Sequence, residues 1–130
     1  MSDLLNAMAA SASGMSAQGH RLRISAENLA NVDTPGYRRK LVPFEALAMD
    51  RAGGAAVQAG RVRLAQGELP RVYDPAHPLA GEDGYYDGSS VELVVEIADA
   101  REAQRSYEAN LQLLDQSRQM TRGLLDLLRR

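Results

Sequence analysis

Between residues 3 and 30, apolar or small residues recur at alternating spacings of three and four, and no proline interrupts them. A heptad repeat of this kind is typical of an α-helix that packs against other helices. Small residues alternate with Met and Leu, so the backbone of a neighbouring helix has room to come close. We expect one row of side chains to form the seam of this helix: Leu5, Met8, Met15, Gly19, Leu22 and Leu29.

The C-terminal region repeats the pattern over a longer stretch, from about residue 91 to 128. We therefore expect a second long helix, with Glu92, Glu96 and Asp99 stabilised at the positive end of its dipole. Near the C-terminus a second apolar row joins the first, and the apolar arc becomes too wide for one partner helix. The predicted seam of this helix consists of Tyr107, Leu111, Leu114, Leu125 and Leu128.

A turn signal follows the first helix. Thr34 precedes a proline and is therefore pushed out of the helical region, so the helix should end near Asn31. Pro35 and Gly36 then fit the central pair of a type II turn. The basic residues 38–40 come next, but without interleaved aromatic residues they are a weak signal for nucleic-acid binding. We expect them to form a solvated or salt-bridging exposed stretch.

The middle of the chain has few residues that would fill a core. The Gly- and Ala-rich stretch 52–59 carries little apolar bulk, and we interpret it as a flexible loop. Residues 61–64 alternate like a half-buried strand and should pair with residues 69–73 in a short hairpin.

These patterns predict a mainly α protein. Its long N- and C-terminal helices should form a coiled-coil-like bundle, with a small loop-rich insert that contains a short β-hairpin. We expect a heptad helix in residues 1–31, a turn motif, extended loop and β insert in residues 32–90, and a second heptad helix in residues 91–130. The two helices together would form one bundle domain.

Composition and motifs exclude most kinds of chemistry. The chain of 130 residues has no Cys and two His, which excludes disulfides, thiolate metal sites and cysteine nucleophiles. The acidic, turn-rich stretch 74–88 lacks the ligand spacing of a calcium-binding EF-hand. No phosphate-binding loop, dinucleotide fingerprint or nucleophile elbow occurs. We therefore expect no enzyme, with no catalytic residue, no cofactor and no metal site, and the net charge of −2 predicts no general attraction to nucleic acid.

The two apolar helices around a small insert are typical of an assembly subunit. The first basic residue is Arg21, too late for a cleavable signal peptide, and no apolar run approaches the length of a membrane helix. A cytosolic coiled-coil adaptor or a secretion chaperone is the alternative. It would form a small closed oligomer, whereas contacts that never close would build a helical tube.

A specific motif adds to this interpretation. Residues 25–39, SAENLANVDTPGYRR, resemble the signature of bacterial flagellar axial proteins, the rod and hook family. The chain matches every defined position of the motif's core: Ala30, Asn31, Thr34, Pro35, Gly36 and Tyr37. Residues 13–18, 73–80 and 105–110 resemble a proximal rod subunit of that family, and residues 89–93 are similar to its sister proximal rod subunit.

The resemblance implies a structural subunit of the proximal rod, polymerised through its terminal helices to build a torque-transmitting drive shaft. Its implied partners are further copies of itself, other rod subunits and the flagellar type III export apparatus, with no nucleic acid and no direct membrane insertion. The implied location is the periplasm-spanning rod of the flagellar basal body, reached without cleavage of a signal peptide.

Overall fold

The computed structural model describes residues 2–48 and 55–130 of the chain. Two long helices dominate it, α1 (Ser2–Ala30) and α2 (Leu93–Leu128). The described residues between them form short strands: β1 (Lys40–Leu41), β2 (Phe44–Ala48), β3 (Ala55–Ala59), β4 (Arg63–Leu64), β5 (Arg71–Tyr73) and β6 (Tyr85–Asp87). The expectation of a mainly helical protein with a small β insert is confirmed.

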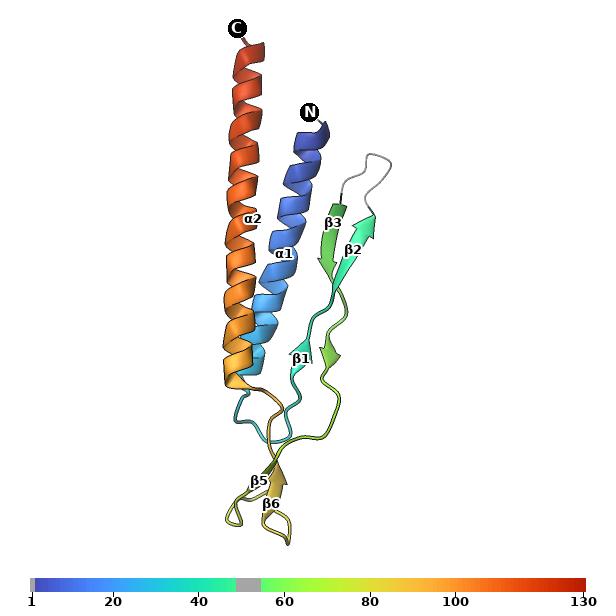
Figure 1. The fold of residues 1–130 in the computed structure, drawn as a ribbon, viewed down its shortest axis with the longest axis vertical. Coiled ribbons are helices and arrows are strands. Elements are labelled where there is room, and N and C mark those ends of the chain that lie inside the picture. The colour runs from blue at the N-terminus through green and yellow to red at the C-terminus, as the bar shows by residue number, and fades with distance from the viewer. Residues whose placement is uncertain (1, 49–54) are drawn as a thin grey trace.

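The two helices lie side by side and antiparallel in an elongated molecule, with both termini at the same end (Figure 1). The last turns of α2 project beyond the start of α1 (Figure 1). The first helix ends at Ala30, one residue before the expected end near Asn31, and Thr34 before Pro35 is disfavoured in a helix. Within the described part of the chain, neither helix carries the long apolar stretch that a membrane crossing needs.

The strands pair in three separate antiparallel ladders, β1 with β4, β2 with β3, and β5 with β6. The expected hairpin between residues 61–64 and 69–73 is therefore wrong. Alternation of apolar and polar residues indicates a strand but not its partner, which depends on the path of the whole insert. Here the Arg39 carbonyl accepts the Ala65 N–H at 2.8 Å beside β1 and β4. The ring centroids of Tyr73 and Tyr85 lie 5.1 Å apart across the β5–β6 pair.

The β2–β3 hairpin packs along α1 on the side away from α2 (Figure 1). Residues 55–59 are thus a strand, and the expectation of a flexible loop over this part of 52–59 is wrong; residues 52–54 lie outside the described residues. Ala17 of α1 and Ala56 of β3 are 2% and 5% exposed. Small side chains that offer little bulk for a core allow a strand and a helix to approach closely.

The chain has a thin apolar core. Among the described residues, the buried apolar side chains are Ala17, Ile24, Ala56, Val91 and Ala103. None of these is a leucine, methionine or aromatic residue, and only Ile24 and Val91 have side chains larger than a methyl group. Most of the large apolar side chains of the two helices must therefore find their burial elsewhere.

Candidate assembly interface

Apart from Ile24, the residues that α1 and α2 bury within the chain are small or polar. A Cβ at Gly14 would lie 2.8 Å from Asn110 Nδ2, so the helices approach closely at this point. Closer to the termini, the Thr121 hydroxyl lies 4.0 Å from Met8 Sδ. The buried residues of the two helices are Ser11, Ala17, Ile24, Ser25, Asn28, Glu96, Ala103 and Ser117.

Large apolar side chains lie instead on the outside of the helix pair. Near the C-terminus we define the leucine arc as Leu124, Leu125, Leu127 and Leu128, whose exposed fractions are 45%, 48%, 65% and 77%. Exposed leucine and methionine continue back along α2 at Leu111, Leu113 and Met120. Several large apolar side chains exposed on neighbouring turns of one helix are typical of an interaction site on a folded chain.

An open apolar groove of about 500 Å³ connects this surface to the start of α1. Leu4 and Ala7 line it from α1, and Leu113, Met120 and Leu124 line it from α2. The candidate interface therefore includes both chain ends, because the antiparallel pairing brings them together.

The predicted seam residues fall into two groups. Exposed ones are Leu5, Leu29, Leu111, Leu125 and Leu128. Half-buried ones are Met8, Met15, Gly19, Leu22, Tyr107 and Leu114. A Cβ at Gly19 would lie 3.9 Å from the Tyr107 ring, so part of the predicted row packs within the subunit. The contribution of each residue to contacts between subunits stays a prediction.

The motif residues form the turn that ends α1. The Asn31 amide donates to the Glu27 carbonyl at 2.8 Å, and the Thr34 hydroxyl donates to Asn31 Oδ1 at 3.0 Å. The Tyr37 N–H donates to the Thr34 carbonyl at 3.2 Å, and Gly36 has a φ of +75°. This hydrogen bond and this positive φ are those of the expected type II turn.

The same turn fastens the helices to the insert. The Gly36 N–H donates to the Asp87 carbonyl at 3.1 Å, beside the β5–β6 pair. The Ser90 N–H, just before α2, donates to the Tyr37 carbonyl at 2.9 Å. The Tyr37 hydroxyl reaches back to α1 and donates to Asn28 Oδ1 at 2.9 Å. The motif thus joins segments that are far apart in the sequence.

Gly36→Val is expected to lower the free energy of unfolding by about 1 kcal/mol or more, because a β-branched residue strongly disfavours a positive φ. No other atom lies within 4 Å of a Cβ placed at Gly36, so the change tests the backbone alone. Urea unfolding followed by circular dichroism measures the effect. Gly123→Val is the matched control, since Gly123 is helical and equally open, and its unfolding free energy should not fall. Equal stability of the Gly36 variant and the parent chain would contradict the turn assignment.

A buried polar cluster lies where the motif, β1 and α2 meet. Asn28 and Glu96 are only 1% and 2% exposed, and Asn28 Nδ2 donates to Glu96 Oε1 at 2.9 Å. Arg39 Nε donates to Glu96 Oε2 at 2.7 Å, and its guanidinium also pairs with Asp99. The Asn28 side-chain amide makes two hydrogen bonds to the backbone of Lys40 in β1. It donates to the Lys40 carbonyl and accepts the Lys40 N–H, both at 2.9 Å. Both oxygens of the buried carboxylate have donors, which offsets its desolvation.

The surroundings of Tyr37 and Arg39 keep both side chains in the protonated forms that donate these hydrogen bonds. We define the Asn28 cluster as Asn28, Tyr37, Arg39 and Glu96. Burial raises the pKa of Tyr37 and the negative charge of Glu27 adds to the effect, so the hydroxyl remains a donor. Burial alone would lower the pKa of Arg39, but the hydrogen bonds and charges of its carboxylate partners outweigh it and raise that pKa.

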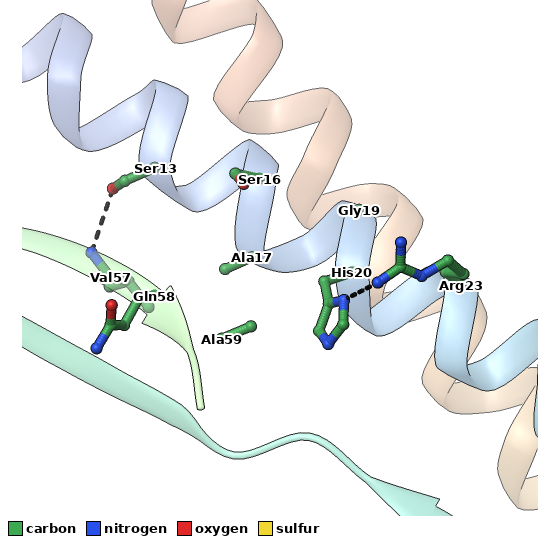
Figure 2. A pocket seen from close by; sticks show the side chains of 9 residues that line it. All are labelled: Ser13, Ser16, Ala17, Gly19, His20, Arg23, Val57, Gln58 and Ala59. Carbon is green, nitrogen blue, oxygen red and sulfur yellow. Dashed lines mark hydrogen bonds between the residues drawn. The ribbon is translucent and has the colours of Figure 1, made fainter. Parts of the chain in front are cut away.

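Figure 2 shows a second, polar groove of about 580 Å³ between α1 and β3. Ser13 Oγ accepts the Val57 N–H at 3.2 Å on one side, and Arg23 donates to His20 Nδ1 on the other (Figure 2). Its lining holds two serine hydroxyls, the Gln58 amide, the His20 ring and the Arg23 guanidinium, without a carboxylate. Among the residues with a described placement, no group of three or more His, Asp or Glu is arranged to hold a metal ion.

Sequence reasoning identified the turn but not the Asn28 cluster. It placed Glu96 at the helix start for its dipole, whereas the structure buries this carboxylate against α1. The interruption of the apolar run Val94, Val95, Ile97 by a carboxylate was the available signal. Arg39 and Lys40 do form salt bridges as expected, whereas Arg38 donates to the backbone carbonyls of Ala65 and Gly67. All three residues are half-buried rather than exposed.

Comparison with known proteins assigns the family. Residues 8–38 match the family described as flagella basal body rod protein, and residues 82–127 match the C-terminal family of flagellar basal body rod FlgEFG proteins. The flagellar basal-body rod protein FlgC of Agrobacterium fabrum is 40% identical over 124 residues, which cover 90% of this chain and 89% of the relative. FlgC of Escherichia coli O157:H7 is 35% identical over 130 residues, 95% of this chain and 97% of the relative. The chain belongs to the FlgC family.

FlgC membership makes the chain a structural rod subunit of the flagellar basal body. FlgC of Aquifex aeolicus is also 39% identical over 118 residues, 85% of this chain and 87% of the relative. These matches do not favour the adaptor, the secretion chaperone or the sister rod subunit FlgB. The two matched ranges contain Asn28 and Glu96 respectively, so both sides of the Asn28 cluster lie in family regions.

Proposed function

We propose that this chain is a non-catalytic subunit of the proximal rod that polymerises through the exposed apolar faces of α1 and α2. Its neighbours are further copies of itself and other rod subunits in one helical assembly. The observation that carries the proposal is the leucine arc, which is exposed on a chain whose own core is thin. Burial of such side chains is the main favourable term in protein association.

The arrangement of the apolar surface favours an open assembly over a closed pair. The leucine arc includes two pairs of adjacent leucines, Leu124–Leu125 and Leu127–Leu128, which point in different directions around the helix axis. One partner helix cannot cover an arc of that width, so at least two neighbours must contribute. Contacts that do not close on themselves generate a helical tube, the form that a drive shaft requires.

The proposed torque transmission follows from the same packing. Seams of helices that repeat along a tube share a shear load over many small contacts, each of which is weak alone. The insert, held to the helix pair by the motif turn, would project from this helical layer toward other neighbours.

We further propose that the subunit reaches the periplasm-spanning rod through the flagellar type III export apparatus, without cleavage of a signal peptide. Two features support passage as an unfolded chain. The absence of cysteine means that no disulfide must be formed or broken. The thin apolar core means that unfolding before passage costs little, because folding stability is a small balance that scales with burial.

Electron microscopy of basal bodies tests this function. A strain that lacks the gene should build membrane-embedded basal structures without a rod, hook or filament, and the intact gene supplied in trans should restore all three. Complete rods and normal swimming in the deletion strain would contradict the proposal. Restoration by a chain whose leucine arc is deleted from Gly123 onward would contradict polymerisation through α2.

A further inference from the structure

The seam between α1 and α2 has few large side chains that fix one axial register, and the Tyr107 ring against Gly19 is one of them. Gly14 faces Asn110 in the structure. If α2 slid by one heptad in either direction, Gly14 would face Ala103 or Ser117 instead, both of which are small and buried. Helices that meet mainly through small side chains lose less apolar burial on sliding than helices with many large interlocking side chains.

The Asn28 cluster does discriminate between these registers. Asn28 is 1% exposed and bonds to Glu96 on α2 and to the backbone of Lys40 on β1. A slide in one direction would place Asn28 opposite Ala103, which has no side-chain group to accept its amide. A slide in the other direction would place it beyond the start of α2, which begins at Leu93. Either slip would break the Asn28–Glu96 bond and leave the buried Asn28 amide without a side-chain acceptor on α2, and unpaired buried polar groups are costly.

We propose that the Asn28 cluster fixes the register of α1 against α2 and so sets how far the leucine arc projects beyond α1. A slip of one heptad would move the arc by roughly 10 Å along the helix axis, given the helical rise per residue. That displacement would carry the arc away from any neighbour that the native register fits. The link from register to assembly rests on the proposed function, whereas the register itself does not.

Disulfide trapping in the purified full-length chain measures the register directly. The chain has no cysteine of its own, so any disulfide that forms within the chain must join the two introduced cysteines. Gly14→Cys with Asn110→Cys reports the native register, because a Cβ at Gly14 contacts the Asn110 side chain. Gly14→Cys with Ala103→Cys, and Gly14→Cys with Ser117→Cys, report the two slipped registers. In the otherwise unchanged chain, only the first pair should form a cross-link within the subunit.

Two variants then remove the bonds by which the Asn28 cluster favours the native register over the slipped ones. Asn28→Leu deletes the amide, and the triple change Asn28→Leu, Arg39→Leu and Glu96→Leu replaces the buried charges with apolar side chains, which often preserves stability. The yield of slipped cross-links relative to native ones should rise about tenfold in each variant that stays helical, since at least one buried hydrogen bond no longer favours the native register. Circular dichroism monitors helicity. Ser25→Ala is the matched control, because Ser25 is 5% exposed and lies outside the cluster, and its cross-links should remain native.

The outcomes show whether the Asn28 cluster selects the register of the two helices or only stabilises their pairing. Slipped cross-links in every variant that stays helical support the proposal. Cross-links that stay native in a helical variant would overturn it. Loss of helicity in both variants would overturn it as well, because the cluster would then hold the helices together rather than select their register. A swimming defect plays no part in this test, so its result stands apart from the proposed function.

Discussion

Replacing Leu125 and Leu128 together by alanine is expected to abolish swimming while the chain still folds and is still secreted. These side chains are 48% and 77% exposed in the single subunit, so their truncation removes little burial within the chain. Once they are buried between subunits, each truncation should cost about 2 kcal/mol or more. The loss recurs at every copy in the polymer, and hook and filament cannot be added without a rod.

A motility assay in soft agar and an immunoblot of the culture medium measure the two halves of this prediction. Leu125→Met with Leu128→Met is the matched control, because methionine keeps an apolar side chain of similar volume at both positions. That variant should swim. Swimming of the alanine variant at the parent rate would show that these leucines cover no essential interface.

Glu96→Ala is expected to lower the free energy of unfolding by about 3 kcal/mol, because it leaves Arg39 and Asn28 without their shared partner. Both carboxylate oxygens of Glu96 are bonded in the structure, at 2.9 Å to Asn28 and 2.7 Å to Arg39. Urea unfolding of the purified chain measures the change. The effect should exceed that of any exposed carboxylate on the same helix.

Glu102→Ala supplies the comparison for that experiment. Its side chain is 67% exposed and lies 3.6 Å from Arg21, so the same substitution there removes only a surface ion pair. The expected loss is below about 1 kcal/mol. Similar losses at Glu96 and Glu102 would contradict the view that the Asn28 cluster is a buried and compensated site.

The helices and the turn were predictable from the sequence because their signals are local. The heptad spacing indicates α1 and α2 without knowledge of their neighbours, and the proline after Thr34 ends α1 wherever the chain goes next. The strand partners were not predictable in this way. Residues 61–64 were expected to pair with the next strand along the chain, but β4 pairs with β1 across the β2–β3 hairpin. Such pairing depends on the path of the insert, which no local pattern specifies.

In the candidate site, too, the local features were predictable from the sequence and the long-range contacts were not. The motif residues stand out in the sequence because they are contiguous, whereas the Asn28 cluster gathers residues 57 and 68 positions apart in its Arg39–Glu96 and Asn28–Glu96 bonds. The apolar rows were visible as periodicity, but periodicity does not say which side of a helix its own chain covers. The structure shows which parts of the apolar rows the chain itself covers. Gly19 packs against Tyr107, whereas the leucine arc remains exposed.

Cysteine labelling of the leucine arc tests the central claim most directly. Leu125→Cys introduces the only thiol in the chain, on a side chain that is 48% exposed in the single subunit. A maleimide reagent should label this thiol rapidly in the purified subunit and about tenfold more slowly in isolated basal bodies, since labelling requires the buried site to open. Dissolving the same basal bodies in detergent should restore rapid labelling. Equally rapid labelling in the subunit and in intact basal bodies would contradict assembly through this surface.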